Sequence, residues 1–283
     1  MSTQTLIIPE VFADVVNEKF GICLKMGTLA TDYTSDVADI TTCGNKVNFP
    51  KFDRVASVNT ITKGTAITPA DINMSDNEAD IKHTGGSIRV FDKDEKQIKG
   101  ATTDKMAQQL VDAMALDLDN SLGATILSEA TLFDECNEKT SLTQNDMLSA
   151  WSLFGDDVNV DSFSGVAINS RLLPSFLSMD LFINKDYTVS QNKNGIVQDN
   201  IIGFFMGVPV IMTNNGTWDS TNSECNTFII KKGALGYVKQ KEVSIEVERE
   251  GKLLCNDIIA SSLYATKVID TDGIVVIKAT LDD

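Results

Sequence analysis

Apolar residues recur at every fourth position in one stretch of this chain, and this pattern constrains the fold more than any other feature. The residues that follow the spacing are Met106, Leu110, Met114, Leu118, Leu122 and Ile126. The spacing is typical of one face of an α-helix, and Thr103-Asp104 provides an N-terminal cap. A helix over residues 103–129 would be about 40 Å long at about 1.5 Å per residue. A sheet or another subunit must therefore cover the apolar face along most of that length.

Polar residues fill the positions between these apolar ones and are expected on the remaining faces of the helix. They are Asp104, Asp112, Asp117, Asp119 and Asn120. The pattern therefore indicates a structural helix, with no arrangement of side chains typical of cofactor binding.

Residues 46–92 have the composition of a projecting β-ribbon. Apolar and polar residues alternate around residues 47–49 and 88–90, which predicts a strand at each end. No aromatic side chain lies between Phe52 and Phe91. A two-stranded ribbon with so few apolar residues is only marginally stable alone in water. We therefore expect it to project from the body and to be stabilised by lying on a neighbouring molecule. The alternative is a disordered surface loop.

The N-terminal segment is expected to be an extended arm that contains one short helix. Pro9-Glu10 is a plausible helix start, with its proline in the first turn. Val11, Val15 and Phe20 then mark one face, which indicates an amphipathic helix.

The remaining predicted elements give an α+β fold. Two further helices are expected, over residues 145–154 and 171–177. Gly203 and Gly207 divide the apolar run at residues 201–212 into a tight hairpin. Further strands are predicted over residues 227–230, 243–247, 260–268 and 274–279, and residues 270–273 form a turn between the last two.

The sequence contains no recognisable catalytic motif. Its single histidine, His83, lies in the predicted ribbon, which is a poor place for a rigid Ser-His-Asp or Cys-His site. Zinc-binding motifs and phosphate-binding glycine loops are absent from the sequence. Glu246, Glu248 and Glu250 occupy alternate positions of one predicted strand and share a face, which is more often solvated than catalytic. We assign no catalytic, cofactor-binding or metal-binding residue.

Charge and cysteine usage exclude further classes of protein. The 40 acidic and 24 basic residues give a net charge of −16, which disfavours nucleic-acid binding because Lys and Arg must displace counterions from phosphates. An anionic surface would also suit a container for packed DNA. The five cysteines are scattered, without paired motifs. With no secretion signal and no apolar run long enough to span a membrane, we expect reduced cysteines and a cytosolic product.

Three short sequences, together with the order of the predicted elements, carry a family resemblance. They are Lys63-Gly64-Thr65-Ala66-Ile67-Thr68-Pro69, Ile201-Ile202-Gly203-Phe204-Phe205-Met206-Gly207-Val208-Pro209-Val210, and Lys232-Gly233-Ala234-Leu235-Gly236-Tyr237 followed by residues 243–250. The chain resembles the Hong Kong 97-type major capsid proteins of tailed bacteriophages, and in particular the coat-protein family typified by phage N4. The resemblance covers nearly the full chain.

The resemblance implies a domain organisation for the α+β fold. Residues 1–45 would be the N-terminal arm, and residues 46–92 the extended loop that reaches over the adjacent subunit. Residues 93–139 would hold the spine helix of a peripheral domain, and residues 140–236 would form the axial domain. Residues 237–283 would return to complete the peripheral sheet.

The resemblance also implies a function and partners. The chain would assemble with itself, as pentamers and hexamers, into the icosahedral head that encloses phage DNA, without sequence-specific DNA binding and without a membrane partner. The residues expected to contact other subunits are Lys63, Gly64, Thr65, Ile67, Val11 and Val15. Because about 45 residues precede the ribbon, a separate scaffolding protein is expected. The resemblance also implies a portal protein during assembly, and it leaves open whether a decoration protein binds the shell. The product would be assembled in the host cytoplasm and found in the virion.

Three alternatives remain open at this stage. An encapsulin, a bacterial compartment with the same fold, would have a gene for a cargo enzyme beside it in place of terminase and portal genes. A phage tail or adhesion protein would show coiled coils or β-repeats, and neither is visible. An enzyme of unfamiliar type would have Glu246, Glu248 and Glu250 as its best candidate site.

Overall fold

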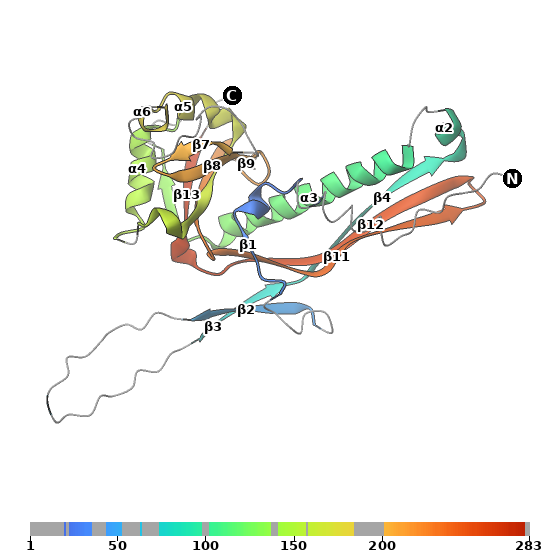
Figure 1. Cartoon of the computed structure of the whole chain (residues 1–283), viewed down its shortest axis with the longest axis horizontal. Helices are drawn as coiled ribbons and strands as arrows, with labels where there is room; N and C mark the ends of the chain where they lie inside the picture. Colours follow the sequence, from blue (N-terminus) through green and yellow to red (C-terminus); the bar gives the residue numbers. More distant parts are fainter. Residues whose placement is uncertain are drawn as a thin grey trace.

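The computed structural model describes residue 20 and residues 23–35, 44–52, 63, 74–97, 102–136, 141–156, 158–183 and 201–280. The chain has an elongated part and a compact part (Figure 1). In the elongated part a long helix lies along a narrow sheet, and in the compact part short helices pack on a second sheet. A two-stranded ribbon projects near the junction of the two parts. The short helix expected to begin at Pro9-Glu10 lies outside the described residues, apart from Phe20, which is helical.

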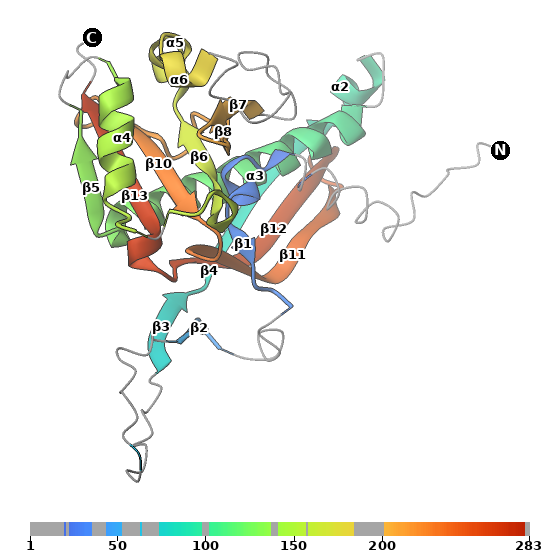
Figure 2. The ribbon, with the colours of Figure 1, turned by 60° about the vertical axis from the view of Figure 1, so that its left-hand side comes forward.

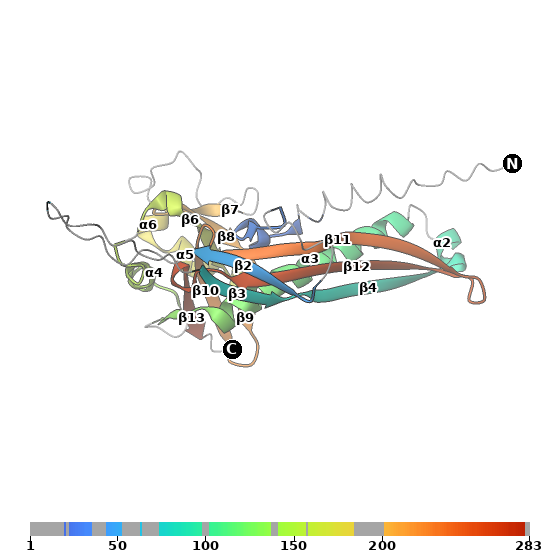
Figure 3. The same cartoon turned by 90° about the horizontal axis from the view of Figure 1, so that it is seen from below.

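The long helix, α3 (Thr102–Glu129), agrees within one residue with the helix predicted from the four-residue spacing. It packs on a four-stranded sheet whose strand order is β1 (Thr31–Asp32), β11 (Leu235–Glu250), β12 (Cys255–Val268) and β4 (Lys82–Phe91). Leu118, Leu122 and Ile126 are buried in the core between them. Figure 3 shows α3 running along one face of these strands, so the sheet supplies the cover that the apolar face needs. The short helix α2 (Asp92–Gln97) follows β4 at the far tip.

The compact part is built on a seven-stranded sheet (Figure 2). Its strands lie in the order β5 (Leu132–Glu135), β13 (Ile274–Thr280), β10 (Glu224–Lys231), β6 (Phe163–Ile168), β8 (Val208–Met212) and β7 (Ile201–Phe205), with β9 (Trp218–Asp219) paired to β10. The two faces belong to different cores. Phe228 and Val276 pack in the core that contains α3, whereas Ile229 and Val275 pack in the core that contains α4 (Gln144–Ser152). Burial on both faces explains why these strands are almost continuously apolar.

Short helices and turns complete the compact part, and several were predicted. α4 and the pair η3 (Ser170–Leu172) and α5 (Leu173–Leu177) confirm the helices expected over residues 145–154 and 171–177. A further helix is α6 (Asp180–Ile183). The other 3-10 helices are η1 (Met26–Thr28), η2 (Val160–Ser162) and η4 (Thr271–Gly273), and η4 lies in the predicted turn between β12 and β13.

The apolar hairpin at residues 201–212 is confirmed, and its turn has a specific cause. Met206 and Gly207 connect β7 to β8 with φ values of 51° and 87°. Two consecutive residues in the left-handed region define a turn whose twist matches that of the flanking strands. A glycine at the second position adopts this conformation without steric cost.

The ribbon is shorter than the sequence predicted. β2 (Lys46–Phe52) pairs with β3 (Met74–Asp80) in an antiparallel register that runs from Lys46↔Asp80 to Phe52↔Met74. Residues 82–91 do not pair with β2. They form β4, which pairs with β12 along its whole length. The alternation around Val90 arises because this side chain is buried in the core under α3, so the ribbon ends at Asp80.

Residues 237–283, which the resemblance assigns to the return strands of the peripheral domain, contribute strands to both sheets. β11 and β12 form the centre of the four-stranded sheet. β13 instead lies between β5 and β10 in the seven-stranded sheet. In this place β13 is buried on both faces, since Val275 and Val276 pack in opposite cores. β5, which falls within residues 93–139, belongs to the seven-stranded sheet as well.

Candidate assembly surfaces

The root of the ribbon is fixed to its own subunit by a small apolar core. This core consists of Val47, Phe49, Ala79, Val238, Ala265 and Ile269. Phe49 is fully buried, and its ring meets the Tyr33 ring edge-on with centroids 6.0 Å apart. The sequence predicted that the ribbon would depend on a neighbour for its stability. That prediction is wrong for the root, because Phe49 alone buries enough apolar surface to contribute about 2 kcal/mol.

Two polar contacts join the ribbon to the connection between the two sheets. The Lys51 ammonium lies 2.9 Å from a carboxylate oxygen of Asp270. The Asn77 amide donates to the backbone oxygen of Ile269 at 3.4 Å. Both partners lie where β12 leaves the four-stranded sheet and the chain turns toward β13. The direction of the ribbon is therefore tied to the position of this connection.

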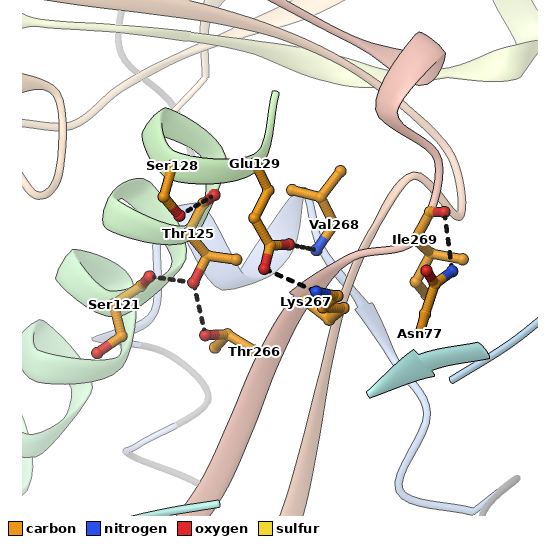
Figure 4. A network of polar contacts seen from close by, with 9 residues as sticks. All are labelled: Asn77, Ser121, Thr125, Ser128, Glu129, Thr266, Lys267, Val268 and Ile269. Carbon is orange, nitrogen blue, oxygen red and sulfur yellow. Dashed lines mark hydrogen bonds and ion pairs between the residues drawn. The ribbon is translucent and has the colours of Figure 1, made fainter. Parts of the chain in front are cut away.

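The C-terminal end of α3 is attached to the same connection by a polar network (Figure 4). The Thr125 hydroxyl donates to the Ser121 backbone oxygen and shares a 2.8 Å hydrogen bond with the Thr266 hydroxyl. Glu129 accepts from the Lys267 ammonium at 2.8 Å and from the Val268 backbone N–H at 2.9 Å. The carboxylate of Glu129 thus uses both oxygens to hold the end of β12. Helix, sheet and ribbon meet in one short stretch of chain.

A buried carboxylate joins α3 to the end of the N-terminal arm. Asp119 has no exposed surface. Its two oxygens accept hydrogen bonds from the backbone N–H groups of Lys25 at 2.9 Å and Gly27 at 3.0 Å. The Asn215 amide, from a loop of the compact part, donates to the same carboxylate at 3.4 Å. Burial raises the pKa of Asp119 above its ordinary value of 3.8, although these hydrogen bonds act in the opposite direction.

The burial of Asp119 was not predicted. The four-residue spacing placed this residue on the faces of the helix that the apolar residues leave. The apolar face is wider than the spacing suggested, since Ala115 is buried one turn before Asp119 and is four residues away from it. A signal was available in the sequence, because Asp119 follows Leu118 directly at the edge of the apolar face. What the sequence lacked was the identity of its three N–H donors, which come from segments more than 90 residues away.

Replacing Asp119 with Asn tests this joint. An Asn side chain keeps one oxygen but turns an NH2 group toward backbone N–H donors. We expect the free energy of unfolding to fall by about 2 kcal/mol at about pH 4. Because the folded pKa is raised, the contribution of the carboxyl is fully present below the unfolded pKa of 3.8 and is lost as pH rises through the folded value. The advantage of the native chain over the variant should therefore shrink as pH rises.

Urea unfolding of unassembled subunits between about pH 3 and pH 7 measures this difference. Glu248→Gln, at an exposed carboxyl group on β11, provides the control and should change the stability by less than about 0.5 kcal/mol. An advantage of the native chain over Asp119→Asn that grows with rising pH would contradict the assignment.

The histidine, the acidic residues of β11 and two buried cysteines, which could in principle act in catalysis, do not form a common site. His83 lies on β4 and is exposed, so it belongs to the four-stranded sheet and not to the ribbon as predicted. Glu246 and Glu248 are exposed on β11. Burial raises the pKa of Cys136 to about 12 and that of Cys225 to about 11, which keeps both thiols protonated. In the described part of the chain, no three His, Cys, Asp or Glu side chains are grouped as metal binding requires.

Two further observations concern disulfides and membrane-spanning helices. None of the described cysteines, Cys23, Cys136, Cys225 and Cys255, forms a disulfide. Among the helices that the structure describes, none has the length and apolarity needed to span a membrane.

The predicted intersubunit contact residues are mostly beyond what the structure describes. Lys63 is described and is an exposed residue in a turn. Gly64, Thr65, Ile67, Val11 and Val15 lie outside the described residues. Their contacts therefore stay predictions. The structure brings together a different set, which sequence reasoning missed: the joint at Asp119, the end of α3 at Glu129, and the ribbon root.

The arrangement of parts is shared with solved phage structures. A chain of the structure of Mycobacterium phage Che8 is 19% identical with a TM-score of 0.67, and the likeness covers 92% of both chains. A chain of the capsid structure of the cyanophage P-SCSP1u is 15% identical with a TM-score of 0.69, over 92% of this chain and 89% of that one. A chain of the capsid of Ralstonia phage GP4 is 11% identical with a TM-score of 0.63, over 90% and 88%.

The chain has the Hong Kong 97-type capsid fold. The α+β class and the fold predicted from the sequence are therefore confirmed. No protein-family model and no curated protein matches the sequence. This sequence is therefore related to its structural neighbours through its three-dimensional structure. The narrower likeness to phage N4 coat proteins stays a prediction.

Proposed function

We propose that this chain is the major capsid protein of a tailed bacteriophage and that it self-assembles, as pentamers and hexamers, into an icosahedral head around phage DNA. The observation that carries this proposal is the extent of the structural likeness. About nine tenths of this chain superimpose on about nine tenths of chains from phage capsids. A likeness of this extent favours a shell subunit over a protein that shares only one domain with such subunits.

The parts of the fold receive roles under this proposal. The four-stranded sheet with α3 acts as the peripheral domain, and the compact part acts as the axial domain whose loops meet at the centres of pentamers and hexamers. The ribbon reaches over an adjacent subunit, and Lys63, Gly64, Thr65 and Ile67 contact that subunit. The exposure of Lys63 and the firm root at Phe49 support this role, since a fixed root aims the ribbon away from its own body. Each contact can be weak because every subunit makes many.

The proposed assembly also implies other protein partners. Scaffolding and portal proteins would act during assembly in the host cytoplasm, a decoration protein would bind the finished shell, and the product would be part of the virion. The net charge of −16 suits the inner surface of a DNA container, because an anionic wall does not bind the genome during packaging. DNA would be enclosed without sequence-specific contacts. The role is structural, and we assign no catalytic residue and no cofactor.

Electron microscopy of the purified chain, expressed with its scaffolding protein, tests the function directly. We expect closed shells or ring-shaped pentamers and hexamers. Monomers alone, from a chain that unfolds cooperatively and is therefore folded, would contradict the proposal. Genes for terminase and portal beside this one would separate a capsid from an encapsulin, whose gene lies beside that of a cargo enzyme.

A further inference from the structure

The sequence contains two Asn-Gly pairs, and the structure describes one of them, Asn215-Gly216. An asparagine before a glycine is chemically reactive, because the backbone nitrogen of the glycine can attack the side-chain carbonyl carbon of the asparagine and release ammonia. Glycine favours this attack since it has no side chain to block the approach and adopts strained backbone conformations at little cost. Whether Asn215 keeps its amide therefore depends on how the fold holds this pair.

The loop that carries the pair lies with its backbone directly against the long helix α3. A Cβ atom added at Gly216 would lie 2.8 Å from the Gly123 Cα and 3.2 Å from the Asp119 backbone oxygen. Contacts of this length leave no room for a side chain on the loop. Any atom that the loop gains at this place must therefore push it away from the helix.

Three hydrogen bonds hold the pair in this position. The Gly216 backbone N–H donates to the side-chain oxygen of Asn120 at 2.9 Å. The Asn215 backbone N–H donates to the Thr213 hydroxyl at 3.1 Å, and the Asn215 side-chain amide donates to the Asp119 carboxylate at 3.4 Å. The nitrogen that would attack and the amide that would be attacked are thus each bound to a side chain of α3. Both hydrogen bonds must break before the two groups can reach the close, aligned arrangement that the reaction requires.

The product of the reaction does not fit the same position. Loss of the amide converts Asn215 into aspartate, or into isoaspartate, whose backbone is longer by a methylene group. Either product adds a carboxylate beside Asp119, whose own carboxylate has no exposed surface. Two carboxylates that share a buried site cannot both be ionised without a large cost, and the longer backbone of isoaspartate lacks space against Gly123. A loop that has reacted is therefore unable to close on α3 again.

We propose that Asn215-Gly216 is a self-modification site, which the contact with α3 keeps unreactive and which converts once the loop leaves the helix. In the open loop the Gly216 nitrogen forms a bond to the side-chain carbonyl carbon of Asn215, and the bond from that carbon to the amide nitrogen breaks. The proton of the Gly216 N–H leaves with the NH2 group as ammonia. Water then opens the succinimide ring to isoaspartate or aspartate, so water is the only further reactant. Opening of the loop becomes irreversible in a single subunit, whether or not the proposed shell forms.

Mass spectrometry of the peptide that contains residue 215, after incubation at mildly alkaline pH, tests this inference. In the folded subunit the reaction should follow the population of the open loop, because such opening is fast compared with loss of the amide. We expect the folded chain to react at least about thirty-fold more slowly than the urea-unfolded chain. Asn120→Ala, which removes the acceptor of the Gly216 N–H from an exposed position, should raise the folded rate about five-fold. Gln109→Ala, also exposed on α3, should leave it unchanged.

Equal rates in the folded and the unfolded chain, or a rate that Asn120→Ala leaves unchanged, would overturn the inference. A second measurement concerns the product. Asn215→Asp should lower the equilibrium constant for folding at least about ten-fold at neutral pH, because its carboxylate lies beside that of Asp119. Asn214→Asp is the matched control: it adds the same charge at an exposed neighbour and keeps the oxygen that accepts from the Ser170 N–H. If Asn215→Asp were as stable as Asn214→Asp, a reacted loop could close again and the reaction would not make opening irreversible.

Discussion

A chain that lacks residues 60–72 is expected to fold normally and to form no stable shells. The deletion falls between β2 and β3, which end opposite one another at Phe52 and Met74, so a shorter loop can still connect them. Val47 and Phe49 remain in the root, and closing a shorter loop costs no additional entropy. Subunit stability should therefore change by less than about 1 kcal/mol. Assembly should fail outright, because each shell subunit loses the contact that the ribbon makes with its neighbour.

Urea unfolding, size-exclusion chromatography and electron microscopy of the same preparation separate these two effects. A variant in which residues 60–72 are replaced by a glycine-serine linker of equal length controls for chain length, and it too should fail to assemble. Phe49→Ala provides the opposite control, since it should cost about 3–4 kcal/mol of subunit stability by emptying the root. Normal particles from the deleted chain would refute the role given to the ribbon.

The elements that sequence reasoning placed correctly are those whose signals are local. α3 was bounded within one residue because its four-residue spacing lies in a continuous stretch, although the helix begins at Thr102, before the expected cap at Thr103-Asp104. The hairpin at residues 201–212 was found for the same reason, since the turn at Gly207 and the apolar strands on either side of it are neighbours in sequence.

The errors concern which strand pairs with which, and pairing is decided by segments far apart in the chain. The alternation around Val90 correctly indicated a strand but could not show that its partner is β12, more than 150 residues away. The sheet that β13 joins was likewise not predictable, because an apolar run indicates burial on both faces without naming the sheet. For the candidate site, Lys63 is exposed and its contact with a neighbour stays a prediction, while Asp119 was missed because its partners are distant in the sequence.

Replacing Gly123 with Ala is expected to destabilise the subunit strongly. The reason is a packing contact that only the structure reveals. In an isolated helix Ala is favoured over Gly by about 1 kcal/mol, so local propensity predicts a gain. Here the backbone of α3 at Gly123 touches the loop of the compact part at Gly216. A Cβ atom at residue 123 would lie 2.5 Å from the Gly216 Cα and 2.7 Å from its carbonyl oxygen. Both are backbone atoms, so the loop itself must move.

That movement has consequences for the joint between the two parts of the subunit. The Gly216 N–H donates to the Asn120 side chain at 2.9 Å, and Asn215 donates to the buried carboxylate of Asp119. A displaced loop weakens both hydrogen bonds and leaves Asp119 with one fewer donor in a buried site. We expect Gly123→Ala to lower the free energy of unfolding by about 2–3 kcal/mol, the upper range for overpacking, despite its better helix propensity.

Urea unfolding at constant pH measures this change, and the slope of the transition shows whether the cooperative unit stays intact. Gly251→Ala is the matched control: nothing lies within 4 Å of the Cβ it would add, so its stability should stay within about 0.5 kcal/mol of the parent. Gly216→Ala should be at least as harmful as Gly123→Ala, because its Cβ would lie 2.8 Å from the Gly123 Cα and its φ of 68° is strained for alanine. If Gly123→Ala instead stabilised the subunit, helix propensity would outweigh the contact, and α3 could not be in close backbone contact with the loop that carries Asn215.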